Sequence, residues 1–302
     1  MSAGPRGDIA AILLPMNGAS TDEAALTLGF DLARRFSANL QALHVATDSR
    51  EVAPLAGEGL SGAMVEEMMS VAERESLRRT TRARTLFDAA LAQGGTAAVT
   101  RTDRLPLVGL GTARTPTASF RTIVGREHEL VAHAARLSDL IVIPHPDSDD
   151  AISSSEALHA VLFDSGRPVI IAPKQAPTSI GRRVCIAWNG TAESAAAVLS
   201  GLCWMHAADA VQVLYSDDYQ RRGPEASELV DYLAGHGINA TKAAFKPRDG
   251  NVGAGLLAAT AAFECDLLAM GAYSHSRLRQ LILGGVTRHV IGKAPLPVLM
   301  AR

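Results

Sequence analysis

The sequence predicts an α/β protein made of two tandem copies of one doubly wound domain, each built on a five-stranded parallel sheet. The chain has 302 residues, which exceeds one α/β core and fits two domains of about 150 residues each. Short aliphatic runs alternate with longer amphipathic segments, a pattern typical of βαβ units. Segments of the first half also recur in the second half, as an internal duplication predicts.

The composition narrows the classes of function. Hydrophobic residues make up 47% of the chain and charged residues 20%, enough to bury substantial cores. Lys plus Arg (29) nearly balance Asp plus Glu (31), so we expect neither a nucleic acid nor an anionic membrane as partner. Neither a signal sequence nor a membrane-spanning apolar run is recognisable, and we expect a cytoplasmic protein. Cys185, Cys203 and Cys265 lack metal-binding spacing and are predicted to be small buried hydrophobes.

The first copy is expected over residues 1–175. It opens with a strand at 9–14, a turn at Asn17-Gly18, and a helix marked by apolar residues at helical spacing. The elements that follow are predicted to be a strand at 40–45, a long charged helix at 62–93, a strand at 119–124, a helix at 126–137, and strands at 140–143 and 169–172. Residues 47–116 are interpreted as an insertion that the second copy lacks.

The second copy is expected over residues 182–302, after a linker rich in turn residues. It opens with a strand at 184–188 and a turn at Asn189-Gly190. The helix after that turn is predicted to bury Ala195, Val198, Leu199, Leu202 and Met205. Further elements are predicted at 210–215, 225–236, 240–245, 252–263, 267–270, 286–292 and 298–300. Each half then has five strands and four helices.

The duplication is visible as matched text. Asn17-Gly18 matches Asn189-Gly190, residues 137–143 match 264–270, and residues 167–172 match 296–301. The separation between the matched Asn and the matched Asp of the second segment is 45 residues longer in the first half. This difference locates the insertion between the second strand and the third helix.

The segment MGAYSHSRLRQLILGGVTRH at 270–289, closed by APLPVLM at 294–300, resembles the C-terminal signature of the universal stress protein family. That family has G-x2-G-x9-G-[ST] before its last helix, and the spacing is intact from Gly271 to Gly284. The resemblance extends more weakly over both halves. It implies the five-stranded fold of adenine nucleotide alpha hydrolase-like proteins, ATP binding in some members, and a stress-response or regulatory role.

The resemblance also implies a site beyond the carboxyl ends of the second-half strands, where helix N-termini offer N–H groups to phosphates. Asn189 and Gly190 would face the base and ribose, while residues 271–277 and 284–286 would hold phosphates. The expected ligand is ATP or another adenine nucleotide with Mg²⁺. The candidate binding residues are Asn189, Gly190, Gly271, Ser274, His275, Ser276, Arg277, Gly284, Gly285, Val286 and Thr287.

Two departures from the family motif lie on the phosphate side. Position 274 is Ser instead of Gly, and position 285 is Gly instead of Ser or Thr. Together they predict affinity for a nucleotide weaker by about ten- to a hundredfold. In the first half, PHPDSDD at 144–150 lacks glycine and carries three acids, so we expect a degenerate site without triphosphate binding.

Two classes of function stay open at this point. The favoured one is a non-enzymatic stress protein that senses a nucleotide or small ligand and changes its contacts with an unknown protein partner. The alternative is a nucleotide-hydrolysing or nucleotidyl-transferring enzyme, which would need a metal-binding acid, and Asp217, Asp218 and Asp249 are the candidates. Because relatives of this family pair through their last strands, we expect 169–172 and 298–300 to pair antiparallel in an internal pseudo-twofold dimer. Association of two chains stays open.

Overall fold

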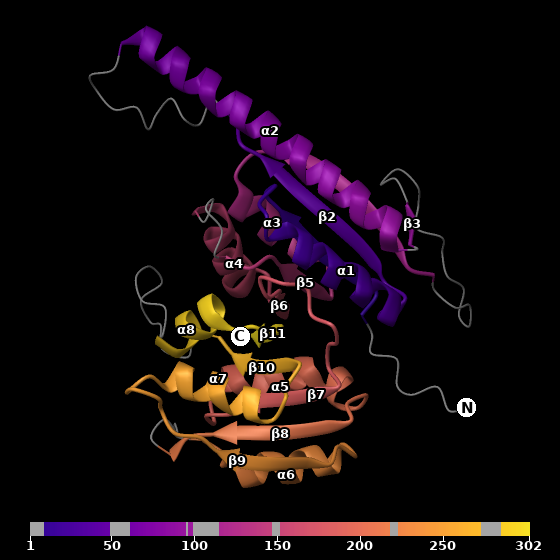
Figure 1. Cartoon of the computed structure of the whole chain (residues 1–302), viewed down its shortest axis with the longest axis vertical. Helices are drawn as coiled ribbons and strands as arrows, with labels where there is room; N and C mark the ends of the chain where they lie inside the picture. Colours follow the sequence, from indigo (N-terminus) through magenta and orange to yellow (C-terminus); the bar gives the residue numbers. More distant parts are fainter. Residues whose placement is uncertain are drawn as a thin grey trace. The chain divides into compact units, whose positions relative to one another are not determined.

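The computed structural model describes residues 9–48, 61–94, 96–98, 115–146, 152–217, 223–272 and 285–302, and these form an α/β fold (Figure 1). The chain divides into two compact units, Ile9–Ser165 and Gly166–Arg302. No helix within the described ranges combines the length and apolar character needed to cross a bilayer.

The first unit is built on a parallel sheet. Its strands are β1 (Ala11–Met16), β2 (Asn39–Ala46), β3 (Ala97–Ala98), β4 (Thr117–Val124) and β5 (Leu140–Ile143), in the order β3-β4-β2-β1-β5. Its helices are α1 (Asp22–Phe36), α2 (Gly62–Gly94), α3 (Glu127–Ala135) and α4 (Ile152–Asp164). All four residues of β5 are buried, which explains why this strand is a continuous aliphatic run.

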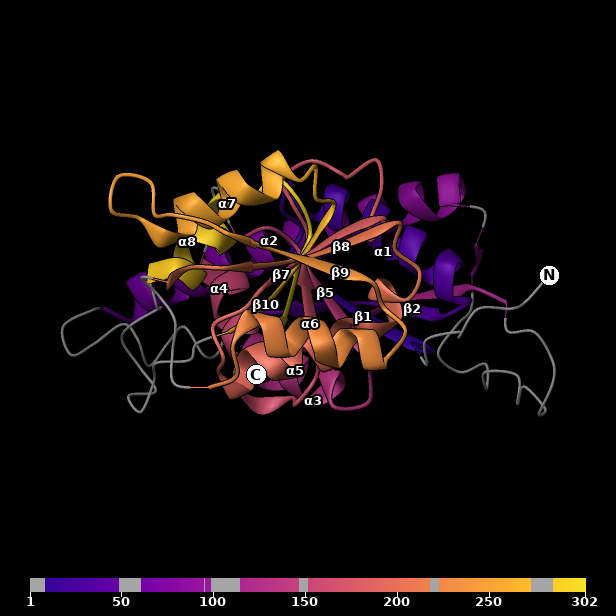
Figure 2. The same ribbon diagram turned by 90° about the horizontal axis from the view of Figure 1, so that it is seen from below.

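The second unit repeats this plan. Its strands are β6 (Val169–Ile171), β7 (Arg183–Ala187), β8 (Ala210–Tyr215), β9 (Ala240–Ala244), β10 (Leu267–Gly271) and β11 (Val298–Ala301), in the order β6-β11-β10-β7-β8-β9. Its helices are α5 (Ala192–Met205), α6 (Ala226–Gly235), α7 (Val252–Ala262) and α8 (Gly285–Lys293). Figure 2 shows α5 and α6 on one face of this sheet and α7 and α8 on the other, as expected for a doubly wound domain.

The same carboxylate clamp occurs in both units. Asp139 Oδ2 accepts hydrogen bonds from the N–H groups of Ala10 and Ala11, at 2.8 and 2.9 Å. Asp266 accepts from the N–H groups of Arg182 and Arg183, at 3.1 and 2.8 Å. Each Asp thus ties the start of the first strand of its unit to the start of the fourth strand of the repeat. This equivalence supports the duplication at the level of single contacts.

The antiparallel pairing of the last strands is confirmed. Val298 lies opposite Ile171, and Met300 lies opposite Val169. Because β6 pairs with β11, its contacts place it in the Gly166–Arg302 unit, although it is the last strand of the first sequence repeat. The pairing covers an edge of β11 that would otherwise expose unpaired backbone groups. The sequence limits of the repeats, 1–175 and 182–302, stay a prediction.

The buried face of α5 was predicted only in part. Leu199 is 67% exposed, Ala195 is also exposed and Leu202 is half-buried, whereas Val198 and Met205 are buried as expected. The residues that α5 buries are Ser194, Ala197, Val198, Gly201, Trp204 and Met205. This face contains small residues because α5 approaches the sheet closely: a Cβ atom at Gly201 would lie 3.4 Å from a methyl group of Leu299. A count of large apolar residues misses such a face.

The remaining predictions differ in smaller ways. The long helix predicted at 62–93 is confirmed as α2, and β3 is a short strand that the pattern did not reveal. Cys185 is buried as predicted, but Cys203 and Cys265 are only partly buried. The segment 249–255 is a capped helix start, since the Asn251 side chain accepts a hydrogen bond from Ala254 N–H at 3.0 Å.

Candidate functional site

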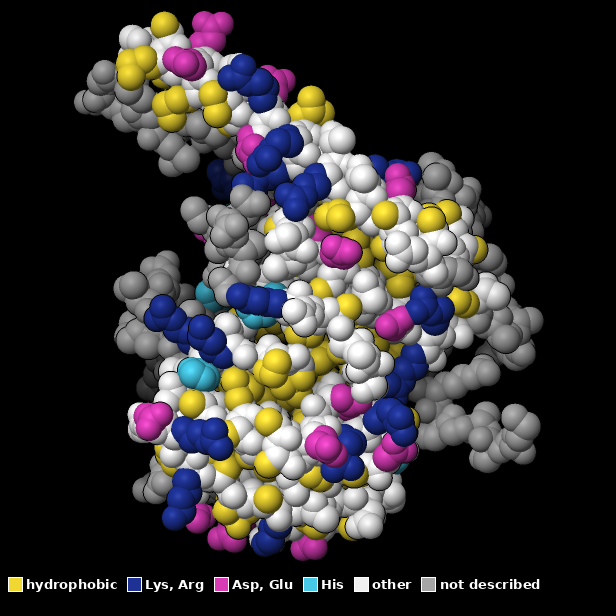
Figure 3. Space-filling view, in the orientation of Figure 1, with side chains coloured by type: hydrophobic (Ala, Val, Ile, Leu, Met, Phe, Trp, Pro, Cys, Tyr) yellow, Lys and Arg dark blue, Asp and Glu magenta, His cyan; other side chains and the backbone are white. Residues whose placement is uncertain are grey.

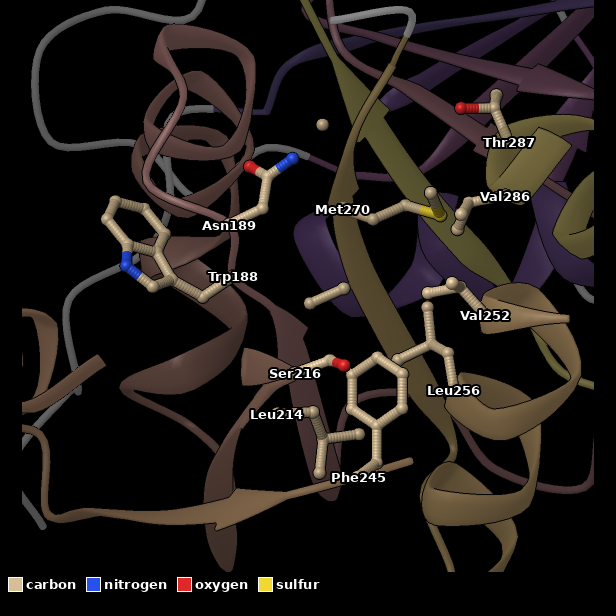
Figure 4. A pocket seen from close by; sticks show the side chains of 12 residues that line it. Trp188, Asn189, Leu214, Ser216, Phe245, Val252, Leu256, Met270, Val286 and Thr287 are labelled. Atoms are coloured by element: carbon tan, nitrogen blue, oxygen red, sulfur yellow. The ribbon is translucent and has the colours of Figure 1, made fainter. Parts of the chain in front are cut away.

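A pocket opens at the carboxyl ends of β7, β8, β9 and β10 in the second unit (Figure 4). The empty space within it, including its open mouth, is about 510 Å³. The lining residues are Ala187, Trp188, Asn189, Leu214, Ser216, Phe245, Val252, Leu256, Met270, Gly271, Val286 and Thr287. Most of them are apolar, and none carries a charge.

Asn189 begins the loop that leaves β7. Its Oδ1 accepts hydrogen bonds from the N–H and the hydroxyl of Thr191, at 3.3 and 3.0 Å. Thr191 in turn caps α5 by accepting from Ser194 N–H at 3.4 Å. The amide oxygen of Asn189 is therefore engaged, and its NH₂ group is the part that can donate to a ligand. In Figure 4 the amide nitrogen lies on the Met270 side of the residue.

Ser216 follows β8 and contributes a buried hydroxyl to the wall. The residue is 4% exposed, and its Oγ finds no hydrogen-bond partner among the described residues. Figure 4 places this hydroxyl beside the ring of Phe245. Buried hydroxyls are nearly always hydrogen-bonded, so an open donor and acceptor at a pocket wall favours a ligand or a bound water.

Trp188 lines the pocket next to Asn189. Its indole points away from Met270 in Figure 4, and its Nε1 donates to the carbonyl of Pro224 at 2.9 Å. Gly190 has a φ of +78° and lies against Gly223. A Cβ atom at Gly223 would lie 2.0 Å from the carbonyl oxygen of Gly190. The loop after β7 is thus locked to the segment before α6. These contacts pre-form the wall rather than bind a ligand.

Gly271 lies in the pocket, but packing requires the glycine. A Cβ atom there would lie 2.6 Å from the backbone N of Ser194 and the backbone C of Glu193, at the first turn of α5. The next amide, Ala272 N–H, already donates to the Ala301 carbonyl at 3.0 Å. Neither position therefore needs a phosphate to explain its residue or its hydrogen bond.

The first turn of α8 supplies the polar end of the pocket. Val286 and Thr287 line it, and Thr287 is 6% exposed. The first N–H groups of a helix lack partners within the helix and carry partial positive charge, which suits an anion. A Cβ atom at Gly285 would meet nothing within 4 Å, so the structure leaves room there for a larger residue.

The structure brings together four of the predicted binding residues, Asn189, Gly271, Val286 and Thr287. Gly190 and Gly285 are described but do not line the pocket. Ser274, His275, Ser276, Arg277 and Gly284 lie outside the described residues. Sequence reasoning missed most of the apolar wall and Ser216. The usable signal was their position, because Ser216 and Phe245 are the first residues beyond β8 and β9.

The acids considered for metal binding do not join the pocket. Asp217 and Asp249 are exposed and absent from its lining, and Asp218 lies outside the described residues. Within the described ranges, no group of three His, Cys, Asp or Glu residues is placed to hold a metal ion.

The same edge of the first unit is built differently. Gly18 has a φ of +79°, like Gly190, but α2 covers it: a Cβ atom at Gly18 would lie 2.7 Å from the Arg79 carbonyl. His44 links β2 to this helix, since its Nε2 lies 3.0 Å from the Thr80 hydroxyl. Asp22 is fully buried where the second unit has Ser194. In the first unit α2 therefore covers the loop that is equivalent to the pocket-bordering loop of the second unit.

Comparisons with known proteins give the family of the second unit. Residues 183–302 match the model of the universal stress protein family. The structure is similar to a universal stress protein from Archaeoglobus fulgidus, with a TM-score of 0.61 and 16% identity over 98% of this chain and 99% of that chain. The structure is also similar to a functionally unknown protein from Pseudomonas aeruginosa, with a TM-score of 0.52 and 13% identity over 97% of this chain and 92% of that chain.

A third similar structure is a universal stress protein in complex with cAMP, which aligns with 56% of this chain and 100% of its own length at 14% identity and a TM-score of 0.31. The sequence matches none of the curated proteins. Residues 183–302 are therefore a universal stress protein domain, and the chain as a whole has the fold of a tandem universal stress protein.

Proposed function

We propose that the pocket of the second unit binds an adenine nucleotide, and that the protein is a stress-response or regulatory protein that senses this ligand. The observation that supports the proposal most strongly is the character of the pocket. Apolar walls at the carboxyl ends of four parallel strands suit a flat heterocycle, and three polar side chains, Asn189, Ser216 and Thr287, suit its polar edges.

The two ends of the pocket differ, and this difference orients the ligand. Ser216 and Phe245 form an end with aromatic and apolar surface and one open hydroxyl, which suits a base. Thr287 lies at the start of α8, where the helix dipole favours phosphate. Asn189 lies across Met270 from Thr287 in Figure 4, and its NH₂ group would donate to the sugar. A nucleotide bound this way satisfies the Ser216 hydroxyl and places a phosphate next to Thr287.

The uncharged lining favours modest affinity. None of the described residues that line the pocket is Lys or Arg, so what the described lining offers a triphosphate is the helix dipole. The two changes in the sequence motif, at positions 274 and 285, likewise predict weaker binding of a nucleotide. We therefore expect ATP to bind no more than about tenfold more tightly than AMP, the factor that corresponds to about 1.4 kcal/mol.

Calorimetric titration tests the proposal. Adenosine, AMP, cAMP, ADP and ATP with Mg²⁺ are titrated into the wild-type protein and into Ser216→Leu, which fills the pocket and removes the hydroxyl. Binding is expected in the wild type and is expected to weaken at least about tenfold in Ser216→Leu. Leu199→Gln, on the exposed face of α5 in the same unit, is the matched control and should bind like the wild type.

The absence of binding by every one of these compounds to the wild-type protein would contradict the proposal. A sensing protein should also return its ligand unchanged. ATP recovered intact after incubation with the protein and Mg²⁺ is the expected result, because Asp217 and Asp249 lie outside the pocket lining. Steady production of ADP or AMP that Asp249→Ala abolishes would favour the enzymatic alternative instead.

A further inference from the structure

Helix α2 is far longer than its counterpart in the second unit. Both α2 and α6 follow the second strand of their unit and precede the next long strand. The first has 33 residues and the second has 10. Since the two units share one plan, the fold itself needs only a short helix here. The remainder of α2 is an addition that the fold does not explain.

Only the C-terminal half of α2 packs on its own unit. Ala83 and Phe87 are buried, and the Phe87 ring lies 5.9 Å from Phe30 and 5.5 Å from Phe120. Arg79 is the residue whose carbonyl lies against Gly18. Residues 62–78 lie beyond this anchor, and none of them is buried. We call this segment, about 25 Å of helix, the α2 extension.

The α2 extension carries an exposed apolar stripe. Met64, Met68 and Val71 are 50%, 40% and 52% exposed, at the i, i+4, i+7 spacing of one helix face. Figure 1 shows this end of α2 projecting away from the sheet of its unit, and Figure 3 shows apolar side chains gathered on it. A helix segment of this length is marginal in water without a packed face.

The stripe has heptad character. With Met68 at position a, Met64 and Val71 occupy d positions, Val65 and Ala72 occupy e, and Glu67 and Arg74 occupy g. Glu67 and Arg74 are exposed, and neither takes part in the ion pairs found among the described residues. Glu75, by contrast, already accepts hydrogen bonds from Arg78 and Arg79.

We propose that the α2 extension pairs antiparallel with the α2 extension of a second copy of this chain. In that arrangement Met68 packs on the partner's Val71, Val65 lies near the partner's Ala72, and Met64 lies against the aliphatic stem of the partner's Glu75. Glu67 then faces the partner's Arg74, and the twofold symmetry repeats each contact. One flank of the seam is apolar and the other is charge-complementary.

The charges favour the antiparallel orientation, and they favour a second copy of this chain as the partner. A parallel pair would place Arg74 next to the partner's Arg79, which is repulsive, and would leave Glu67 next to an alanine. The antiparallel pair instead creates two Glu–Arg contacts from one sequence. A self-complementary pattern of opposite charges is what an isologous interface requires.

Sedimentation equilibrium of the full chain tests the pairing over a wide concentration range. The wild type is expected to associate reversibly to a dimer. Met68→Lys places a charge in the seam and should raise the dimer dissociation constant at least about tenfold. Leu77→Lys is the matched control, because Leu77 is 67% exposed on the opposite side of the same helix and should leave the constant unchanged.

A charge exchange tests the orientation. Glu67→Arg and Arg74→Glu should each weaken the dimer about three- to tenfold, and the double variant should restore it. Circular dichroism checks that each variant keeps its helix. A wild type that stays monomeric, a dimer that survives Met68→Lys, equal loss in Leu77→Lys, or a double variant weaker than both single ones would overturn the proposal.

Discussion

Asp22 is a fully buried carboxyl group at the start of α1. Its pKa is raised to about 7, chiefly because the carboxyl group is buried, and the charge of the nearby Glu127 acts in the same direction. The N–H groups of Gly18 and Asn17 and the charge of Arg82 act the other way, and Gly18 donates to Oδ2 at 2.8 Å. The folded state therefore holds the proton of Asp22 near neutrality, whereas the unfolded chain releases it near pH 4.

This difference makes the stability of the first unit depend on pH. Between about pH 4 and pH 7 the folded state binds one more proton than the unfolded state, so its free energy of unfolding falls as pH rises. A change of pKa from 3.8 to about 7 corresponds to about 4 kcal/mol of the free energy of unfolding. This amount is lost as the pH rises through that window, and Asp22 causes no further loss above it. Asp22→Asn should remove this slope and be the more stable protein at about pH 8.

Urea unfolding at about pH 5 and about pH 8 measures the effect as the difference between wild type and variant. Asp31→Asn, a half-exposed acid on the same helix that pairs with Arg34, serves as the control for the loss of a carboxylate from α1. Equal slopes in the wild type and Asp22→Asn would show that Asp22 does not hold its proton in the folded state.

Single residues were predictable where one local rule decides them. Asn189 and Asn17 begin equivalent turns, and each Oδ1 accepts an N–H two residues on, as the Asn-Gly text implies. Ser216 could not be identified this way, because its role depends on three strands that end at the same level. Asp22 was missed as well, because an acid in the first turn of a helix is ordinarily exposed and its burial is set by the tertiary fold.

At the scale of elements, glycines in the family motif serve different purposes. Gly271 is the position at which α5 approaches β10, and a side chain there would collide with backbone atoms that cannot rotate away. At Gly285, the first described residue of α8, a Cβ atom would meet no described atom within 4 Å. The same motif therefore contains one glycine that packing requires and one that it does not.

Alanine at these two positions should have opposite effects. Gly271→Ala is expected to lower the free energy of unfolding of the second unit by about 1–3 kcal/mol, through overpacking against Ser194 and Glu193. Gly285→Ala is expected to be neutral or to stabilise by up to about 1 kcal/mol, because alanine favours the helix. Chemical unfolding of both variants measures this, and a neutral Gly271→Ala would contradict the packing explanation.

Helices were easier to place than to orient. The sequence predicted α2 to within a residue at its C-terminal end, because its charges and Gly94-Gly95 mark a long exposed helix. The buried face of α5 was predicted wrongly at Leu199, because Ser194, Ala197 and Gly201 carry no hydrophobic signal. Close packing favours small residues, and the periodicity of large apolar residues does not reveal where small residues are buried.

For the whole molecule, the duplication was the most secure prediction. Matched text at Asp139 and Asp266 corresponds to matched carboxylate clamps, and the matched last strands pair antiparallel. The pairing of β6 with β11 was predicted, but its consequence, that β6 belongs to the second compact unit and not to the first, was not. The position of the pocket followed from the fold, but most of its wall did not.

The central claim is that the ligand site of this tandem protein lies in the second unit alone. Hydrogen exchange measured by mass spectrometry, with and without saturating ATP and Mg²⁺, tests it most directly. We predict slower exchange at the ends of β7, β8 and β10 and at the start of α8, with no change in Ile9–Ser165. Unchanged exchange around Asn189, Ser216 and Thr287, or protection confined to Ile9–Ser165, would contradict the account.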